Sequence, residues 1–225
     1  MIVVFINIKG GCGKSTSAIH LSRYLLKRDK QVAFLDADPQ QTAIDWIESL
    51  QASIPRPEYR CASQAKTLRR QLRECVDHFD VTIVDSPPGI GRLQRILLLF
   101  ADVVMIPVQP GIPDLRATLK LLKAVHLARG ARRRFEPTAA LPAIGQPEFK
   151  AFTFLVRTAP NALLVDKARR LLRDREEAFF LDTDIPQRQI LADAMGIGAT
   201  VFDINTRPAR QAAESYRRLF EAAGL

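Results

Sequence analysis

Short apolar runs alternate with helical patterns along most of the chain. The runs that read as buried strands are residues 2–6, 32–35, 81–84, 103–106 and 151–156, with weaker ones near 58–61 and 178–181. Between them, apolar residues recur at the three- and four-residue spacing of a helix face. This alternation is typical of α/β folds in which helices cover both faces of a parallel sheet. We therefore predict an α/β fold with a mostly parallel, twisted sheet.

Two helical segments illustrate the pattern. A helix over 64–79 and another over about 208–222 are both expected to cover the sheet. The apolar face of the first is formed by Leu68, Leu72, Cys75 and Phe79, with Arg69, Arg70 and Arg73 turned away.

Residues 129–150 interrupt the alternation. They begin with Arg-Gly-Ala-Arg-Arg-Arg and continue through Pro137, Pro142, Gly145 and Pro147. We interpret this segment as a surface insertion. Its four arginines could contact DNA or a partner, or they could be a solvated cluster that closes a helix, because cations are favoured at helix C-termini.

The bulk composition is that of an ordinary globular protein. A length of 225 residues suits a single domain over 1–225, and 47% hydrophobic with 25% charged residues is typical of soluble chains. The chain opens on an apolar strand and contains no run long enough to span a membrane, so we expect a cytoplasmic protein. The 3 cysteines suit neither a disulfide framework nor a paired-cysteine metal site.

The net charge of +9 favours a polyanionic partner. Nucleic acid and an anionic membrane surface both fit, and composition does not distinguish them.

A glycine-rich segment with two lysines follows the first apolar run. It reads Lys9-Gly10-Gly11-Cys12-Gly13-Lys14-Ser15-Thr16. Glycines let successive backbone N–H groups turn toward one point, where they and the positive end of the next helix can hold a phosphate. In such a P-loop Lys14 would reach the β- and γ-phosphates, Ser15 would bind Mg²⁺ and Thr16 could reach the α-phosphate.

Lys9 is a second lysine, although the phosphates need only one. If Lys9 projects outward, it could reach a phosphate held by a second copy of the chain, which predicts a dimer that encloses nucleotide. A solvated surface lysine is the plain alternative.

Two downstream motifs extend the pattern. Asp36-Ala37-Asp38-Pro39-Gln40 follows one strand, and Val81-Thr82-Ile83-Val84-Asp85-Ser86-Pro87-Pro88-Gly89 contains another. With the loop, they resemble the ParA/MinD family of deviant Walker A ATPases, and small plasmid-type ParA partition ATPases in particular. Weaker similarity covers 107–110 and 185–202. The resemblance implies a P-loop NTPase fold, ATP and Mg²⁺ as cofactors, and ATP hydrolysis that is slow without a partner.

The resemblance also implies roles for the aspartates. Asp85 would hold Mg²⁺ through water beside Ser15, although it could instead cap a helix. Asp38 would orient the attacking water and the Mg²⁺ shell, whereas we expect Asp36 to be structural. Because the loop and both aspartate motifs follow strands directly, we expect them to converge at the carboxyl edge of the sheet. The candidate catalytic residues are Lys9, Lys14 and Asp38.

Histidine is not expected to act as a base here. His20, His78 and His126 fall on helix faces outside these motifs.

Contacts to the base and to DNA follow from the resemblance as well. Arg157 and Pro186 match the region that surrounds adenine in relatives. ParA-like dimers bind DNA without sequence preference, and a ParB-like or cargo-adaptor protein stimulates hydrolysis. The residues that we predict for DNA, the first two at positions used by relatives, are Arg188, Arg207, Arg210, Arg217 and Arg218. Each could equally be a solvated helix charge.

We therefore predict a nucleoid-associated ATPase that dimerises on ATP, binds DNA and partitions or positions a plasmid, a chromosome region or a protein body. One alternative is a MinD-like membrane cycle, because Tyr216-Arg217-Arg218-Leu219-Phe220 superficially resembles an amphipathic anchor. We expect this segment to be core, with no stable membrane association. A second alternative is a metabolic ATP-dependent enzyme on the same scaffold.

Overall fold

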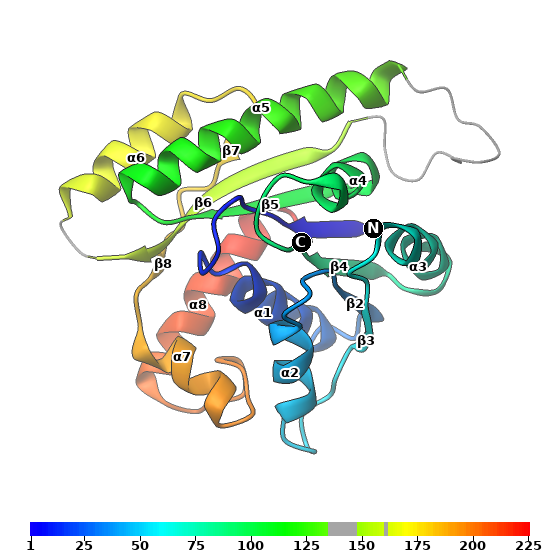
Figure 1. The fold of residues 1–225 in the computed structure, drawn as a ribbon. Helices are drawn as coiled ribbons and strands as arrows, with labels where there is room; N and C mark the ends of the chain where they lie inside the picture. The colour runs from blue at the N-terminus through cyan, green and yellow to red at the C-terminus, as the bar shows by residue number, and fades with distance from the viewer. Residues whose placement is uncertain (135–147, 160–161) are drawn as a thin grey trace.

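The computed structural model describes residues 1–134, 148–159 and 162–225 (Figure 1). Its strands are β1 (Ile2–Phe5), β2 (Val32–Asp36), β3 (Glu58–Cys61), β4 (Val81–Asp85), β5 (Val103–Val108), β6 (Lys150–Thr158), β7 (Phe179–Phe180) and β8 (Ile185–Pro186). They are ordered β3-β2-β4-β1-β5-β6-β7, β8 pairs with β6, and the strand pairings are parallel. The predicted parallel α/β sheet is confirmed.

Helices cover both faces of this sheet (Figure 1). One face carries α1 (Lys14–Leu26), α2 (Thr42–Ser49), α7 (Gln189–Gly196) and α8 (Arg207–Ala222). The other carries α3 (Ala65–His78), α4 (Arg92–Phe100), α5 (Ile112–Arg134) and α6 (Leu163–Arg173).

The central strand β1 shows how the sequence builds this arrangement. Val3 and Phe5 point into the core beneath α1 and α8, whereas Ile2, Val4 and Ile6 point into the core on the other side. All five side chains are fully buried. A continuous apolar run is therefore required, because a strand covered on both faces has no side exposed to water.

The predicted elements lie close to the observed ones. Helix 64–79 is α3, with Leu68, Leu72 and Cys75 buried, and helix 208–222 is α8. The weak strand at 178–181 is only the two-residue β7, and β8 was not predicted as a strand. Both are short pairings with β6, and two residues are too few to show a strand-like hydrophobic pattern in the sequence.

The predicted insertion at 129–150 begins too early. Residues 129–134 complete α5, and 135–147 lie outside the described residues. Arg129 donates to the carbonyls of Phe149 and Glu177, and Arg132 donates to that of Ala101. Both guanidinium groups lie over the Phe149 ring. Arg129 and Arg132 are therefore packing residues at the amino ends of β5 and β6. The exposed Arg133 and Arg134, in the last turn of α5, fit the predicted solvated cluster that closes a helix.

The segment that resembles a membrane anchor is part of the core. Tyr216, Leu219 and Phe220 of α8 are at most 1% exposed and pack on the sheet. In the described parts of the chain, every helix is too short or too polar to cross a bilayer.

Candidate functional site

The glycine-rich loop lies at the carboxyl end of β1, in the middle of the sheet. β1 pairs with β4 on one side and β5 on the other, so the strand order reverses here. Open α/β sheets bind ligands at such a point. Gly11 and Gly13 adopt φ angles of +69° and +83°, which side chains disfavour, and Gly13 leads directly into α1. The loop therefore ends on unpaired helix N–H groups that can hold an anion.

The loop closes on the backbone carbonyl of Lys9. The Lys14 ammonium donates to this oxygen at 3.1 Å, and the Cys12 thiol donates to it at 3.3 Å. Lys14 and Cys12 are both buried, and burial raises the pKa of the Cys12 thiol. The phosphate lysine is thus already folded over the loop.

Two side chains outside the predicted set support the loop. Asn7, which is fully buried, donates to the Pro107 carbonyl at 2.7 Å and accepts the Lys9 N–H at 3.3 Å. Gln109 donates to the Gly11 carbonyl at 2.9 Å. Sequence reasoning missed both roles. The available signals were a polar residue inside an apolar run and a polar residue just after a strand.

Lys9 differs from Lys14 in its surroundings. Lys9 is half-exposed, and within the residues that the structure describes its ammonium has no hydrogen-bond or ion-pair partner. Its charge is therefore available to a group outside this chain.

Asp85 ends β4 beside the loop and is 1% exposed. Burial raises the pKa of its carboxyl to about 7, against the opposing effects of a hydrogen bond from Ser15 and the charge of Lys14. Its Oδ1 has no hydrogen-bond partner among the described residues. Helix α4 begins at Arg92 with Gly91 as its N-cap. The alternative that Asp85 caps this helix is therefore wrong.

The two aspartates of the second motif have different environments. Asp36 is fully buried, and its Oδ2 accepts the N–H groups of Ala43 and Ile44 at 3.2 and 3.3 Å in the first turns of α2. This confirms Asp36 as structural, and burial raises the pKa of its carboxyl. Asp38 is half-exposed, and its carboxylate accepts the Gln40 N–H at 3.0 Å.

The oxygens at this edge suit Mg²⁺. The negative charge of Asp38 raises the pKa of the Asp85 carboxyl, so the two groups are close enough to interact electrostatically. Mg²⁺ in nucleotide sites takes one or two protein oxygens together with phosphates and water. The unpartnered Oδ1 of Asp85 and the Ser15 hydroxyl fit this donor set. In the described ranges, no group of three or more His, Cys, Asp or Glu side chains could hold a metal by itself. Two protein oxygens leave the remaining positions around such an ion to phosphates and water.

The two predicted adenine residues come together at the end of β6. Pro186 pairs with Thr158, and the exposed Arg157 adopts a φ of +53° at the irregularity between paired positions. The neighbouring Val156 lies against the loop, since a Cβ added to Gly13 would lie 3.9 Å from its Cγ2. Arg157 and Pro186 thus lie near the phosphate loop, and their contact with adenine stays a prediction.

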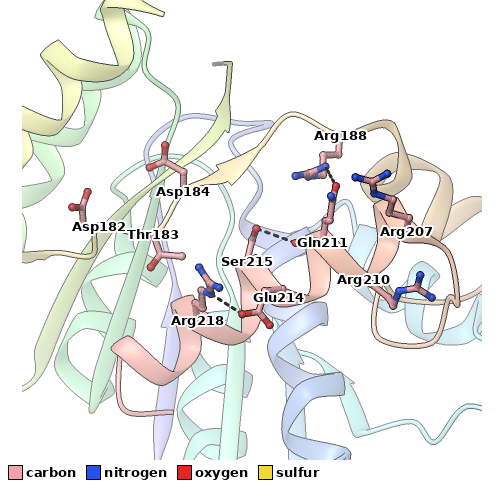
Figure 2. A pocket seen from close by; sticks show the side chains of 10 residues that line it. All are labelled: Asp182, Thr183, Asp184, Arg188, Arg207, Arg210, Gln211, Glu214, Ser215 and Arg218. Atoms are coloured by element: carbon pink, nitrogen blue, oxygen red, sulfur yellow. Dashed lines mark hydrogen bonds and ion pairs between the residues drawn. The ribbon is translucent and has the colours of Figure 1, made fainter. Parts of the chain in front are cut away.

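A hollow beside α8 gathers four of the five predicted DNA arginines (Figure 2). Its lining consists of Asp182, Thr183, Asp184, Arg188, Arg207, Arg210, Gln211, Glu214, Ser215 and Arg218. Figure 2 shows Arg188, Arg207 and Arg210 at one end and the two aspartates at the other. One end of the hollow is therefore cationic.

The charges at the cationic end are not neutralised. Arg188 donates to the Gln211 amide oxygen at 2.9 Å, and Arg210 donates to the Asn205 amide oxygen at 2.8 Å. Arg207 is exposed and has no partner in the described part of the chain. Because amide oxygens carry no net charge, all three guanidinium groups keep their attraction for an anion.

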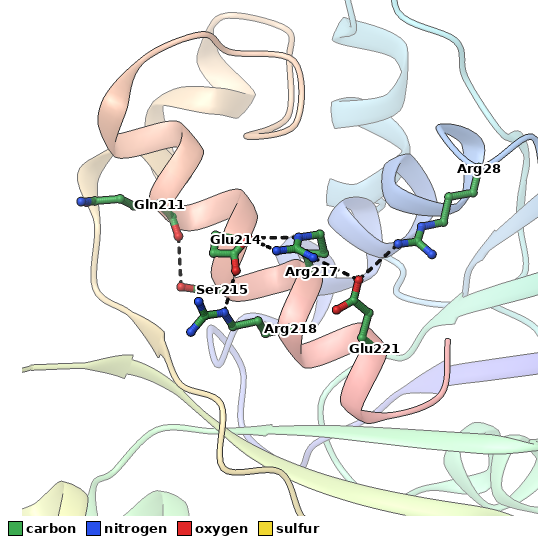
Figure 3. Close-up of polar contacts among 7 residues, drawn as sticks. All are labelled: Arg28, Gln211, Glu214, Ser215, Arg217, Arg218 and Glu221. Carbon is green, nitrogen blue, oxygen red and sulfur yellow. Dashed lines mark hydrogen bonds and ion pairs between the residues drawn. The ribbon is translucent and has the colours of Figure 1, made fainter.

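Arg217 and Arg218 are different (Figure 3). Glu214 accepts from Arg217 Nε at 3.0 Å and from Arg218 Nε at 2.6 Å. Glu221 accepts from Arg217 and from Arg28, which lies just beyond the end of α1, each at 3.3 Å. Arg217 lies outside the hollow, on the side of α1. The two carboxylates weaken both arginines as contacts for an anion.

The family profile of the CobQ/CobB/MinD/ParA nucleotide binding domain matches residues 3–207. The chain belongs to this family. It is 27% identical over 216 residues to "Maintenance of carboxysome distribution protein A" of Halothiobacillus neapolitanus, which covers 95% of this chain and 91% of that protein. It is 26% identical over 251 residues to "Chromosome-partitioning ATPase Soj" of Thermus thermophilus, with 97% and 93% covered.

The fold is shared with solved members of the family. An ATP complex of McdA from Cyanothece has a TM-score of 0.73 at 16% identity, with 100% of this chain and 96% of that chain covered. The protein is therefore a nucleotide-binding ATPase of the ParA/MinD family.

Proposed function

We propose that this ParA/MinD-like ATPase dimerises on ATP, binds DNA without sequence preference and partitions or positions a cargo in the cytoplasm. The observation that carries the proposal is the pair of loop lysines. Lys14 folds into its own loop, whereas the Lys9 ammonium has no partner among the described residues. One charge serves the chain's own nucleotide, and the other remains for the γ-phosphate held by a second copy.

The roles of the other residues follow from their placement. Backbone N–H groups of residues 10–16 would hold the phosphates, and Lys14 would neutralise their charge. Ser15 and Asp85 would hold Mg²⁺, and Asp38 would orient the attacking water. Since the motifs contain no histidine to act as a base, we expect slow basal hydrolysis that a ParB-like or cargo-adaptor protein accelerates.

The DNA surface would centre on Arg188, Arg207 and Arg210. Their charges face neutral partners, so contact with DNA phosphates breaks no ion pair. Phosphate contacts of this kind carry no base information, which suits binding across a nucleoid.

The cargo is constrained by the relatives. Their names point to carboxysome distribution and to chromosome partitioning, which supports either a protein body or a chromosome region as the load. A membrane cycle is disfavoured because the apolar residues that would enter lipid, Tyr216, Leu219 and Phe220, are buried in the core that α8 shares with α1 and the sheet.

Light scattering tests the dimer. The Asp38→Ala variant should hold ATP without hydrolysing it, and with Mg²⁺ it should show twice the 25.2 kDa monomer mass. Adding Lys9→Ala should return it to monomer at the same concentration. The matched control is Lys30→Ala, which removes an exposed lysine beyond α1 and should stay dimeric. A monomer in saturating ATP, or a dimer indifferent to Lys9, refutes the proposal.

Salt dependence tests the DNA surface. Binding of a labelled duplex should weaken linearly on a log-log plot, and Arg207→Ala should reduce the slope by about 0.9 for the lost phosphate. Arg69→Ala, an exposed arginine on α3 of the opposite face, should leave the slope unchanged. Equal slopes for both variants would show that Arg207 does not contact DNA. ATP-dependent sedimentation with anionic liposomes in place of DNA binding would favour the membrane alternative.

A further inference from the structure

The ring of His20 connects the phosphate loop to the segment before α8. Its Nδ1 lies 2.6 Å from the carbonyl of Thr16 in the first turn of α1, and its Nε2 lies 3.3 Å from the N–H of Val201. A carbonyl only accepts and a backbone N–H only donates, so Nδ1 carries the proton and Nε2 is the acceptor. Complete burial lowers the pKa of His20 to about 4, which keeps this neutral form at physiological pH.

The same ring also packs against two other helices. It stacks on Tyr216 of α8 with centroids 4.6 Å apart and planes 9° from parallel. Trp46 of α2 meets it edge-on at 5.5 Å and donates to the Ala199 carbonyl at 3.0 Å. α1, α2, α8 and the segment 199–201 therefore meet at one imidazole.

Two routes from the nucleotide edge reach this point. The first is α1, which begins at the loop lysine Lys14. The second is α2, whose first turns are hydrogen-bonded to Asp36, two residues before Asp38. A change at either motif when the γ-phosphate binds would move a helix that touches His20.

Polar contacts along α1 extend the connection toward α8. Arg23 donates to Asp203 at 2.7 Å in a nearly buried ion pair, and Lys27 donates to the Phe202 carbonyl at 2.6 Å. Helix α1 therefore holds the 199–203 segment that leads into Arg207, so the segment would follow a movement of α1.

We propose that His20 is a positioning residue that couples nucleotide binding to the orientation of α8 and its DNA-contacting arginines. The inference rests on the proposed function, because it assumes that α8 binds DNA. ATP would favour the arrangement in which the distance between Arg207 and Arg210 matches the spacing of phosphates along the DNA backbone. Since coupling between two sites is reciprocal, DNA must raise ATP affinity by the same factor as ATP raises DNA affinity.

The coupling factor is measured as the ratio of duplex dissociation constants without and with ATP, in the slow-hydrolysis Asp38→Ala background. His20→Phe keeps the stack on Tyr216 but removes both ring nitrogens. We expect it to lower the factor at least fivefold while the ATP affinity without DNA and the DNA affinity without ATP change less than twofold. A purely structural role would weaken both affinities and spare the ratio. The matched control is Ser22→Ala on α1, because the buried Ser22 Oγ has no partner among the described residues.

The outcomes separate the two ideas. If the Asp38→Ala protein binds DNA in an ATP-dependent way and the added His20→Phe leaves that dependence unchanged, the coupling is refuted and the proposed function stands. If the DNA affinity of the Asp38→Ala protein is the same with and without ATP, the proposed function and the coupling are both refuted. If His20→Phe does not fold, the coupling is tested by amide hydrogen exchange of the Asp38→Ala protein. ATP should then slow exchange in residues 199–203 and at the start of α8. Protection confined to α1 overturns the inference.

Discussion

Replacing Asp85 by asparagine should stabilise the protein without nucleotide and abolish its response to nucleotide. The Asp85 carboxyl lies at the end of β4, 1% exposed, with one oxygen that has no partner among the described residues. In the proposed function, the charge of this carboxylate serves to hold Mg²⁺. Asp85→Asn removes the charge and keeps the shape.

The size of the effect follows from the pKa of this carboxyl. It rises from 3.8 to about 7 on folding, a change of about 3 units at 1.36 kcal/mol each, so the ionised folded form bears a cost of about 4 kcal/mol above pH 7. As the pH falls from 7 toward 3.8, the folded state takes up the proton first and the cost disappears. Because the new amide N–H groups also need partners, we expect a gain of about 1–4 kcal/mol at pH 8 and none near pH 4.

Urea unfolding followed by the fluorescence of Trp46 measures this directly, since it is the only tryptophan and is 3% exposed. ATP with Mg²⁺ at a hundred times its dissociation constant should add about 2.7 kcal/mol to the wild type and far less to Asp85→Asn. The exposed Asp77→Asn is the control and should change neither quantity. The reasoning fails if the variant is less stable than wild type at pH 8, or if the gap between them does not depend on pH.

Three further substitutions test other contacts. Gln109→Ala removes the side chain that donates to the Gly11 carbonyl and should weaken nucleotide binding about threefold in a fluorescent-nucleotide titration. An unchanged nucleotide affinity would show that Gln109 does not support the loop. Gly198→Ala should lower the free energy of unfolding in urea by at least about 2 kcal/mol, because at φ +64° its Cβ would lie 2.2 Å from the Ser49 carbonyl oxygen. The control Gly224→Ala, at φ +76° in open space, should lower it by about 1 kcal/mol. Equal losses for the two variants would contradict the clash. Glu214→Gln frees Arg218 and leaves Arg217 paired with Glu221, so it should raise DNA affinity several-fold and steepen the salt slope by about 0.9. Glu74→Gln, which removes the partner of Arg60 and Arg70 on the other face, should leave the slope unchanged, and identical slopes for the two variants would show that Arg218 does not contact the DNA.

The strands, their parallel pairing and the phosphate loop could be predicted from local patterns. A strand buried on both faces needs a continuous apolar run, and a loop that turns its N–H groups inward needs glycine, so β1 and Gly13 leave signals within a few residues. Asp36 as a structural residue was also readable, because it stands at the end of an apolar strand.

Other features arise only when distant segments meet. Gln109 contacts the loop from 98 residues away, and His20 joins Thr16 to Val201, 181 residues on; neither position has a local pattern that reveals its partner. The five predicted DNA arginines look alike in sequence, yet the fold sets neutral amides beside Arg188 and Arg210 and carboxylates beside Arg217 and Arg218.

The sequence by itself determined the architecture, the nucleotide loop and the family, because periodicity and backbone conformation are properties of neighbouring residues. Tertiary structure decided which charges are neutralised, which carboxyl is buried with a raised pKa and which helices share a contact. Those depend on burial and on distances between side chains far apart along the chain, and they exist only after the sheet has brought its strand ends together.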